Sequence, residues 1–100
     1  MIGYKLFRER KDGTLGPLFI NRTQKLSLGV WYRAEEHRTK GFAFRPGWHI
    51  CGSPRAPHLT MRENRAWYEV EFCKIDEVER PLSQGGVWYL GSSMKVLRKL

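Results

Sequence analysis

The alternation of apolar and polar residues in RAWYEVEFCKI, residues 65 to 75, is the feature that most constrains the fold. Successive side chains of a β-strand point to opposite faces of its sheet. We therefore expect a strand whose inner face carries Ala66, Tyr68, Val70 and Phe72. The other face, which stays in water or meets a basic neighbour, carries Arg65, Trp67, Glu69, Glu71 and Cys73.

Shorter strands are expected along the rest of the chain, at residues 4 to 9, 15 to 20, 42 to 51 and 87 to 91. Asp12-Gly13 lies between the first two and favours a tight hairpin. Pro17 has no amide donor, so the second strand is expected to start at an edge or a bulge.

In the segment 42 to 51, we expect Trp48 and Ile50 to point toward the core. His49 and Cys51 are expected on the opposite face, because they occupy the alternate positions of the strand. Residues 94 to 100 either continue the last strand or turn helical.

The best helix candidate is LSLGVWYRAEEH, residues 26 to 37. Ala34 and the two glutamates after it favour a helix, whereas Gly29 and Val-Trp-Tyr favour a strand at the front. We expect a strand or turn that enters one or two helical turns. The predicted fold is a single α+β domain over residues 1–100, with a bent, mostly antiparallel sheet of five or six short strands and one short helix.

The composition indicates a globular protein without a membrane partner. Hydrophobic residues make up 41% of the chain, which is enough to form a core. No apolar run approaches the roughly 20 residues that span a bilayer, and the first residues lack the apolar segment of a signal peptide. Cys51 and Cys73 fit free thiols in a reducing compartment, so a cytoplasmic location is expected.

Positive charge is concentrated in the first two thirds of the chain. The net charge is +8; residues 1–62 hold twelve Lys and Arg against four Asp and Glu, whereas residues 63–100 hold six of each. Basic residues interleaved with aromatics are a common signature of nucleic-acid or nucleotide binding, although a solvated basic face is the alternative. The expected ligand-binding residues are Arg8, Arg10, Lys11, Arg22, Lys25, Trp31, Tyr32, Arg45, His49 and Arg55.

The segment GFAFRPGWHICGSPRAPH, residues 41 to 58, allows three kinds of site. His49, Cys51, His58 and Cys73 are residue types that zinc prefers, but their spacing is not that of a structural zinc site, and no metal or other cofactor is expected. Cys51 with a histidine as base would be a catalytic thiol. The third reading is an anion site, in which the amides of Gly52 and Ser53 and the guanidinium of Arg55 hold a phosphate.

Four segments together resemble a family of small uncharacterised proteins of tailed bacteriophages and prophages: YKLFRERKDGTLGPLFINR, TKGFAFRPGWHICGSPRAPHL, WYEVEF and GGVWYLGSSMKV. This resemblance covers nearly the whole chain and implies a host-cytoplasmic protein that acts by binding. The chain is also similar, through YKLFR and GWHIC, to ADP-ribosyltransferase-like folds, which implies a site with Arg8, His49 and a glutamate such as Glu69 or Glu71. The late strand GGVWYLG lacks the glutamate that such a transferase carries there.

The function that we favour is a non-enzymatic phage-type protein that binds a phosphate-bearing ligand, either nucleic acid or a nucleotide, through its basic face. One alternative is an ADP-ribosyltransferase-like enzyme, possibly degenerate. The other is a phage inhibitor whose basic face meets an acidic host protein.

Overall fold

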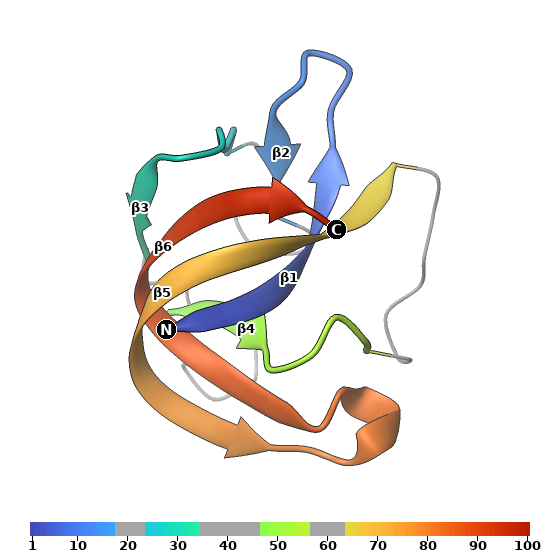
Figure 1. Cartoon of the computed structure of the whole chain (residues 1–100), viewed down its shortest axis with the longest axis vertical. Coiled ribbons are helices and arrows are strands. Elements are labelled where there is room, and N and C mark those ends of the chain that lie inside the picture. Colours follow the sequence, from blue (N-terminus) through green and yellow to red (C-terminus); the bar gives the residue numbers. More distant parts are fainter. Residues whose placement is uncertain (18–23, 35–46, 57–63) are drawn as a thin grey trace, which may run out of the picture.

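The computed structural model describes residues 1–17, 24–34, 47–56 and 64–100. They form one antiparallel sheet of six strands (Figure 1): β1 (Ile2–Glu9), β2 (Leu15–Gly16), β3 (Trp31–Arg33), β4 (Trp48–Cys51), β5 (Arg65–Glu79) and β6 (Val87–Lys99). The helical content of this part of the chain is a single 3-10 turn, η1 (Leu82–Gln84). The described structure is therefore all-β, and the expected α+β class with a short helix is wrong.

The front of the segment 26 to 37 forms a turn and a strand, as expected. Leu26 makes an isolated bridge to Leu15, Gly29 has a positive φ of 76°, and β3 comes next with Trp31 opposite Lys95 of β6. Pairing with β6 fixes residues 31 to 33 as a strand, because tertiary contacts decide where local propensity is weak. Residues 35 to 37 lie outside the described residues.

Strands β5 and β6 form a long hairpin rather than two short strands, with 15 and 13 residues. Their pairing extends from Tyr68↔Lys99 to Glu79↔Val87, so residues 94 to 99 continue the strand and do not turn helical. The register shifts between Glu69 and Val70, and again between Cys73 and Asp76. Such bulges bend a strand and increase its twist, and Figure 1 shows the hairpin curling over the rest of the molecule.

The sheet closes on itself through β1 and β4. Strand β1 pairs with β5 from Ile2↔Glu71 to Arg8↔Arg65, but with β4 only at Tyr4↔Cys51. Since β4 also pairs with β6, the hydrogen-bonded neighbours run β1–β5–β6–β4 and return to β1. Beside the single β1–β4 pair, Lys5 Nζ donates a hydrogen bond of 2.7 Å to the carbonyl oxygen of His49. A side chain thus strengthens the narrowest junction of the closed sheet.

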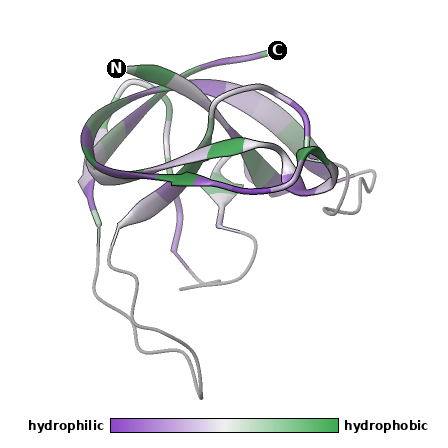
Figure 2. Ribbon diagram, turned by 90° about the horizontal axis from the view of Figure 1, so that it is seen from below, coloured by the Kyte–Doolittle hydropathy of each residue, from purple (hydrophilic) through white to green (hydrophobic). Residues whose placement is uncertain are grey.

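The core lies inside the closed sheet, and apolar and polar positions alternate along the strands (Figure 2). The inner face expected for residues 66 to 72 is confirmed, because its four side chains are each at most 9% exposed. Trp48 and Ile50 are buried as expected, at 8% and 0%. Cys51 is also 0% exposed but is not part of the core cluster; its thiol lies 3.6 Å from the Gly85 carbonyl oxygen, so the loop before β6 covers it.

Gly3 marks the point of closest packing between β1 and its neighbours. A Cβ atom there would lie 2.5 Å from Ile50 Cγ2 and 2.9 Å from Phe72 Cε1. We expect Gly3→Ala to lower the free energy of unfolding by about 1–3 kcal/mol, because overpacking a core forces its neighbours to shift. Urea denaturation measures the change. Ile2→Ala is the matched control, since Ile2 is 49% exposed, and an equal loss in both variants would contradict the close packing at Gly3.

Lys5 makes stability depend on pH in a defined direction. Desolvation lowers the pKa of Lys5 to about 8, whereas burial and the hydrogen bond to Glu9 raise the pKa of Tyr68 to about 12. Above pH 8 the folded protein loses the Lys5 proton while the unfolded chain keeps it, so this lysine contributes a free energy of unfolding that rises with pH.

We therefore expect wild type to gain about 1–2 kcal/mol relative to Lys5→Met between about pH 7.5 and 9.5, below the titration of unfolded tyrosine. Chemical denaturation of both proteins across this range measures the difference. A difference that stays constant or shrinks as pH rises would contradict a desolvated ammonium at this position.

Candidate functional site

The expected ligand-binding residues fall in separate places within the described part of the chain. Arg8, Arg10, Lys11 and Lys25 lie around the β1–β2 hairpin, at the upper end of Figure 1. Arg55 lies beside the loop that contains η1, while Trp31 and Tyr32 are in β3 and His49 is in β4. Arg22 and Arg45 lie outside the described residues. The described cations thus do not share one patch.

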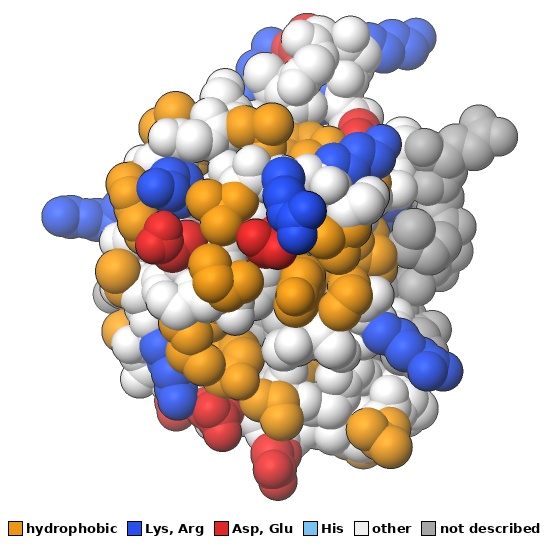
Figure 3. Space-filling model, in the orientation of Figure 1, with side chains coloured by type: hydrophobic (Ala, Val, Ile, Leu, Met, Phe, Trp, Pro, Cys, Tyr) orange, Lys and Arg blue, Asp and Glu red, His pale blue; other side chains and the backbone are white. Residues whose placement is uncertain are grey.

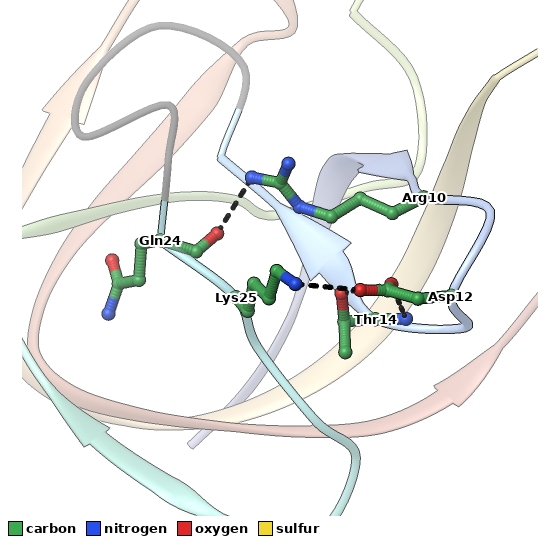
Figure 4. Close-up of polar contacts among 5 residues, drawn as sticks. All are labelled: Arg10, Asp12, Thr14, Gln24 and Lys25. Carbon is green, nitrogen blue, oxygen red and sulfur yellow. Dashed lines mark hydrogen bonds and ion pairs between the residues drawn. The ribbon is translucent and has the colours of Figure 1, made fainter.

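The hairpin itself confirms the turn expected at Asp12-Gly13, and Asp12 organises it (Figure 4). Its carboxylate accepts hydrogen bonds from the Thr14 hydroxyl at 2.6 Å and the Thr14 amide at 3.0 Å, and it pairs with Lys25 Nζ at 2.9 Å. These contacts, the Thr14 hydroxyl first, hold the pKa of Asp12 well below its usual range. Lys25 is therefore engaged in the hairpin.

Arg10 also serves the hairpin. Its Nη2 donates a 3.0 Å hydrogen bond to the carbonyl oxygen of Gln24 (Figure 4). The guanidinium lies over Gly16, where a Cβ would approach Nη2 to 2.8 Å, so the glycine makes room for it. Arg10 thus joins residues 24 to 26 to β2, a structural role that the charge pattern alone did not show.

Many of the other described cations are paired with carboxylates, and Figure 3 shows Lys and Arg spread over the visible face with Asp and Glu among them. In the parts of the chain that the structure describes, the ion pairs are Lys25–Asp12, Lys74–Glu77, Lys95–Glu71, Arg98–Glu69 and Lys99–Glu9. Neutralised pairs of this kind contribute little net field.

The two aromatic candidates in β3 differ. Trp31 is 46% exposed, and Lys95 Nζ lies 5.1 Å from the centroid of its ring. Tyr32 packs against the core cluster, and its hydroxyl accepts a hydrogen bond of 2.8 Å from the Ser27 amide. Trp31 therefore presents a surface for stacking, whereas Tyr32 is a structural residue.

An open groove of about 430 Å³ lies between the turn after β4 and the loop before β6. Among the described residues, its lining consists of Ser53, Arg55, Leu82, Ser83 and Gly85. No carboxylate is among these residues, and no hydrogen bond or ion pair within the described residues involves the side chains of Ser53, Arg55 or Ser83. The groove therefore combines one cation with two hydroxyl groups that can donate to an anion.

Backbone contacts hold the two walls of the groove together. The Gly52 amide donates to the Val87 carbonyl at 2.9 Å, so it is not available to an anion as the sequence suggested. Gly85 ends η1 with a φ of 94°, and a Cβ there would lie 3.2 Å from both Arg55 O and Cys51 Sγ. Only glycine combines this backbone conformation with so close an approach.

The Cys51 thiol lies beneath the groove and contacts both walls. Sγ is 3.6 Å from the Gly85 carbonyl oxygen and 3.8 Å from that of Arg55. With 0% exposure and two carbonyl oxygens as neighbours, Cys51 acts as a packed structural thiol rather than a nucleophile.

The other two interpretations of this region are only partly within the described residues. These residues contain no group of three His, Cys, Asp or Glu that could hold a metal ion; Cys51 is buried, Cys73 is exposed, and His58 lies outside them. For the transferase-like interpretation, Glu69 is paired with Arg98 at 3.0 Å and Glu71 with Lys95 at 3.7 Å. Both carboxylates are thus already engaged on β5.

The sequence indicates the two loops that form the groove but not that they lie side by side. SQGG at 83 to 86 is recognisable as a loop, and its two glycines signal a tight return into β6. Its position beside Ser53 and Arg55 depends on the pairing of Cys51 with Trp88, which no local pattern indicates.

Comparison of the chain with protein-family models, with curated proteins and with solved structures found no match. The described residues contain no helix of the length and apolar character that crossing a membrane requires.

The two cysteines should differ sharply in reactivity. We expect a thiol reagent such as dithionitrobenzoate to modify Cys73 in the folded protein and Cys51 only after denaturation, because reagent access depends on exposure. Absorbance at the two conditions gives the thiol count, and Cys73→Ser identifies the residue that reacts. Rapid reaction of Cys51 in the folded protein would contradict its structural role.

Proposed function

We propose that this protein binds a phosphate-bearing ligand without catalysing its conversion, and that the phosphate occupies the groove lined by Ser53, Arg55, Leu82, Ser83 and Gly85. The observation that carries the proposal is the position of Arg55 in a groove whose described lining contains no carboxylate. A guanidinium binds phosphate through two parallel hydrogen bonds, and the serine hydroxyls can complete its coordination. The groove volume falls in the range of small-molecule sites, roughly 300–1,000 Å³.

A nucleotide or another small phosphate ester fits this arrangement better than a long nucleic acid. Polynucleotide binding draws on many cations that lie along one surface. Here the described cations of the hairpin are not among the residues that line the groove, and several other cations are in ion pairs. Leu82, 87% exposed, adds an apolar contact at the rim for the uncharged part of the ligand.

The resemblance to small tailed-phage proteins would place this binding in a host cytoplasm, where nucleotides are abundant. Ligand binding by the hairpin residues, including Lys11, and by Arg22 and Arg45 stays a prediction. So do the alternatives of an acidic host protein as partner and of a transferase-like enzyme.

Replacing Arg55 tests the proposal. We expect Arg55→Gln to weaken binding of AMP, ATP or pyrophosphate by about tenfold or more, since hydrogen bonds to a charged group contribute about 1.5–3 kcal/mol. Arg33→Gln removes the same charge from an exposed arginine of β3 and should change affinity less than about twofold. Isothermal titration calorimetry measures both.

A single-stranded oligonucleotide, titrated at two salt concentrations, separates the two ligand classes. A groove that holds one phosphate gives a weak salt dependence, whereas a polynucleotide surface gives a steep one. Equal losses in Arg55→Gln and Arg33→Gln, or no binding of any of these phosphates, would overturn the proposal.

A further inference from the structure

Strand β3 is an edge of the sheet in the part of the chain that the structure describes. It pairs with β6 alone, and Figure 1 shows it at the left margin of the molecule. The Ala34 amide donates to the Ser92 carbonyl at 2.8 Å, which fixes the alternation of hydrogen bonds along the strand. Alternate residues of an antiparallel strand turn their peptide groups to the same side, so those of Tyr32 face β6. The N–H and C=O groups of Trp31 and Arg33 therefore face away from β6.

The outer edge of β3 is accessible. Among the described residues, no hydrogen bond uses the outward peptide groups of Trp31 and Arg33. Both side chains are exposed, and none of the ion pairs within the described residues involves Arg33. Leu28, Val30 and Trp31 are 53%, 45% and 46% exposed, so large apolar side chains lie at the surface in and before the strand. An edge of this kind is a template for pairing with another strand.

We propose that two copies of this chain associate through β3, with the two strands antiparallel about a two-fold axis at Tyr32. Trp31 of each copy then lies opposite Arg33 of the other copy. Their peptide groups already face outward, so each of these two pairs exchanges both N–H and C=O groups in hydrogen bonds. The same surface thus meets itself, as a closed two-fold dimer requires.

The side chains of this register favour a second copy as the occupant. Trp31 and Arg33 are on the same face of β3, so each indole meets the guanidinium of the other copy. Arginine stacks favourably on the face of tryptophan. Lys95 Nζ already lies 5.1 Å from the centroid of the Trp31 ring, so this indole interacts with a cation within one copy as well. A register shifted by two residues would place Arg33 opposite Arg33, where like charges repel.

The association should be weak, because β3 is short. A strand of three residues buries less area than the roughly 1,200 Å² at which specific interfaces become stable. We therefore expect a dissociation constant on the order of 0.1–1 mM. None of the described residues that line the groove around Arg55 belongs to β3, so this association goes beyond the proposed function and does not depend on it.

Amide hydrogen exchange, followed by NMR at protein concentrations well below and well above this constant, tests the geometry in the wild type. The amides of Trp31 and Arg33 should exchange about fivefold or more slowly at the high concentration, because the second copy then accepts their hydrogen bonds. The amides of Tyr32 and Ala34 should be protected at both concentrations, since they face β6.

Substitutions test the side-chain contacts by sedimentation equilibrium. Trp31→Ala and Arg33→Gln should each weaken association about tenfold, because each change removes both symmetric contacts of the dimer. Arg80→Gln, which removes the same charge from an exposed arginine after β5, is the matched control and should change association less than about twofold. Arg33→Gln should weaken association without weakening phosphate binding, which separates this proposal from that of the groove.

Three results would overturn the proposal. The first is a protein that stays monomeric at the high concentration. The second is association that leaves the amides of Trp31 and Arg33 in fast exchange, since another surface would then join the copies. The third is equal weakening by Arg33→Gln and Arg80→Gln. Should Trp31→Ala fail to fold, amide exchange in the wild type still decides the question.

Discussion

The bend of the β5–β6 hairpin is the constraint on which the rest of the described structure depends. Register shifts near residues 69 and 73 to 76 curve the long ribbon, so that β6 offers one stretch of its edge to β4 and another to β3. β1 then closes the sheet between β5 and β4. This closure encloses the aromatic core and brings the turn after β4 beside the loop before β6. The groove is therefore a consequence of sheet curvature and not of either loop alone.

Local patterns predicted the inner face of β5 because burial on one face leaves a period of two in the sequence. The same reasoning could not predict the length of β5, since residues 76 to 79 are mostly acidic and disfavour a strand by propensity. They form one because β6 supplies a partner for each of them. The described part of the segment 26 to 37 also depends on β6: Gly29 allows a turn, and β6 pairs with β3 directly after that turn.

The site was predicted in part, and the gaps have physical causes. Arg55 and Ser53 stood out because a Gly-Ser-Pro-Arg turn carries donors, whereas Leu82 and Ser83 approach them only through the pairing of β4 with β6. Parity could not show that Cys51 is buried, since the segments that cover its thiol, at Arg55 and Gly85, come together only through folding. Charge counting could not show that Arg10 and Lys25 are used within the hairpin, since their partners, Gln24 and Asp12, become neighbours only through folding.

A net charge of +8 can act either as one extended field or as a few local sites, and the described contacts favour the second. Ion pairs cancel charge at short range. At physiological salt the Debye length is about 8 Å, so the remaining exposed charges are screened from one another when they lie farther apart than this. Two cations then stand apart by environment. Arg55 lies in an open groove beside two serine hydroxyl groups, where a guanidinium can bind a phosphate through two parallel hydrogen bonds. Lys5 is half-buried and donates a hydrogen bond to the His49 carbonyl, so it serves the closure of the sheet rather than a field in the solvent.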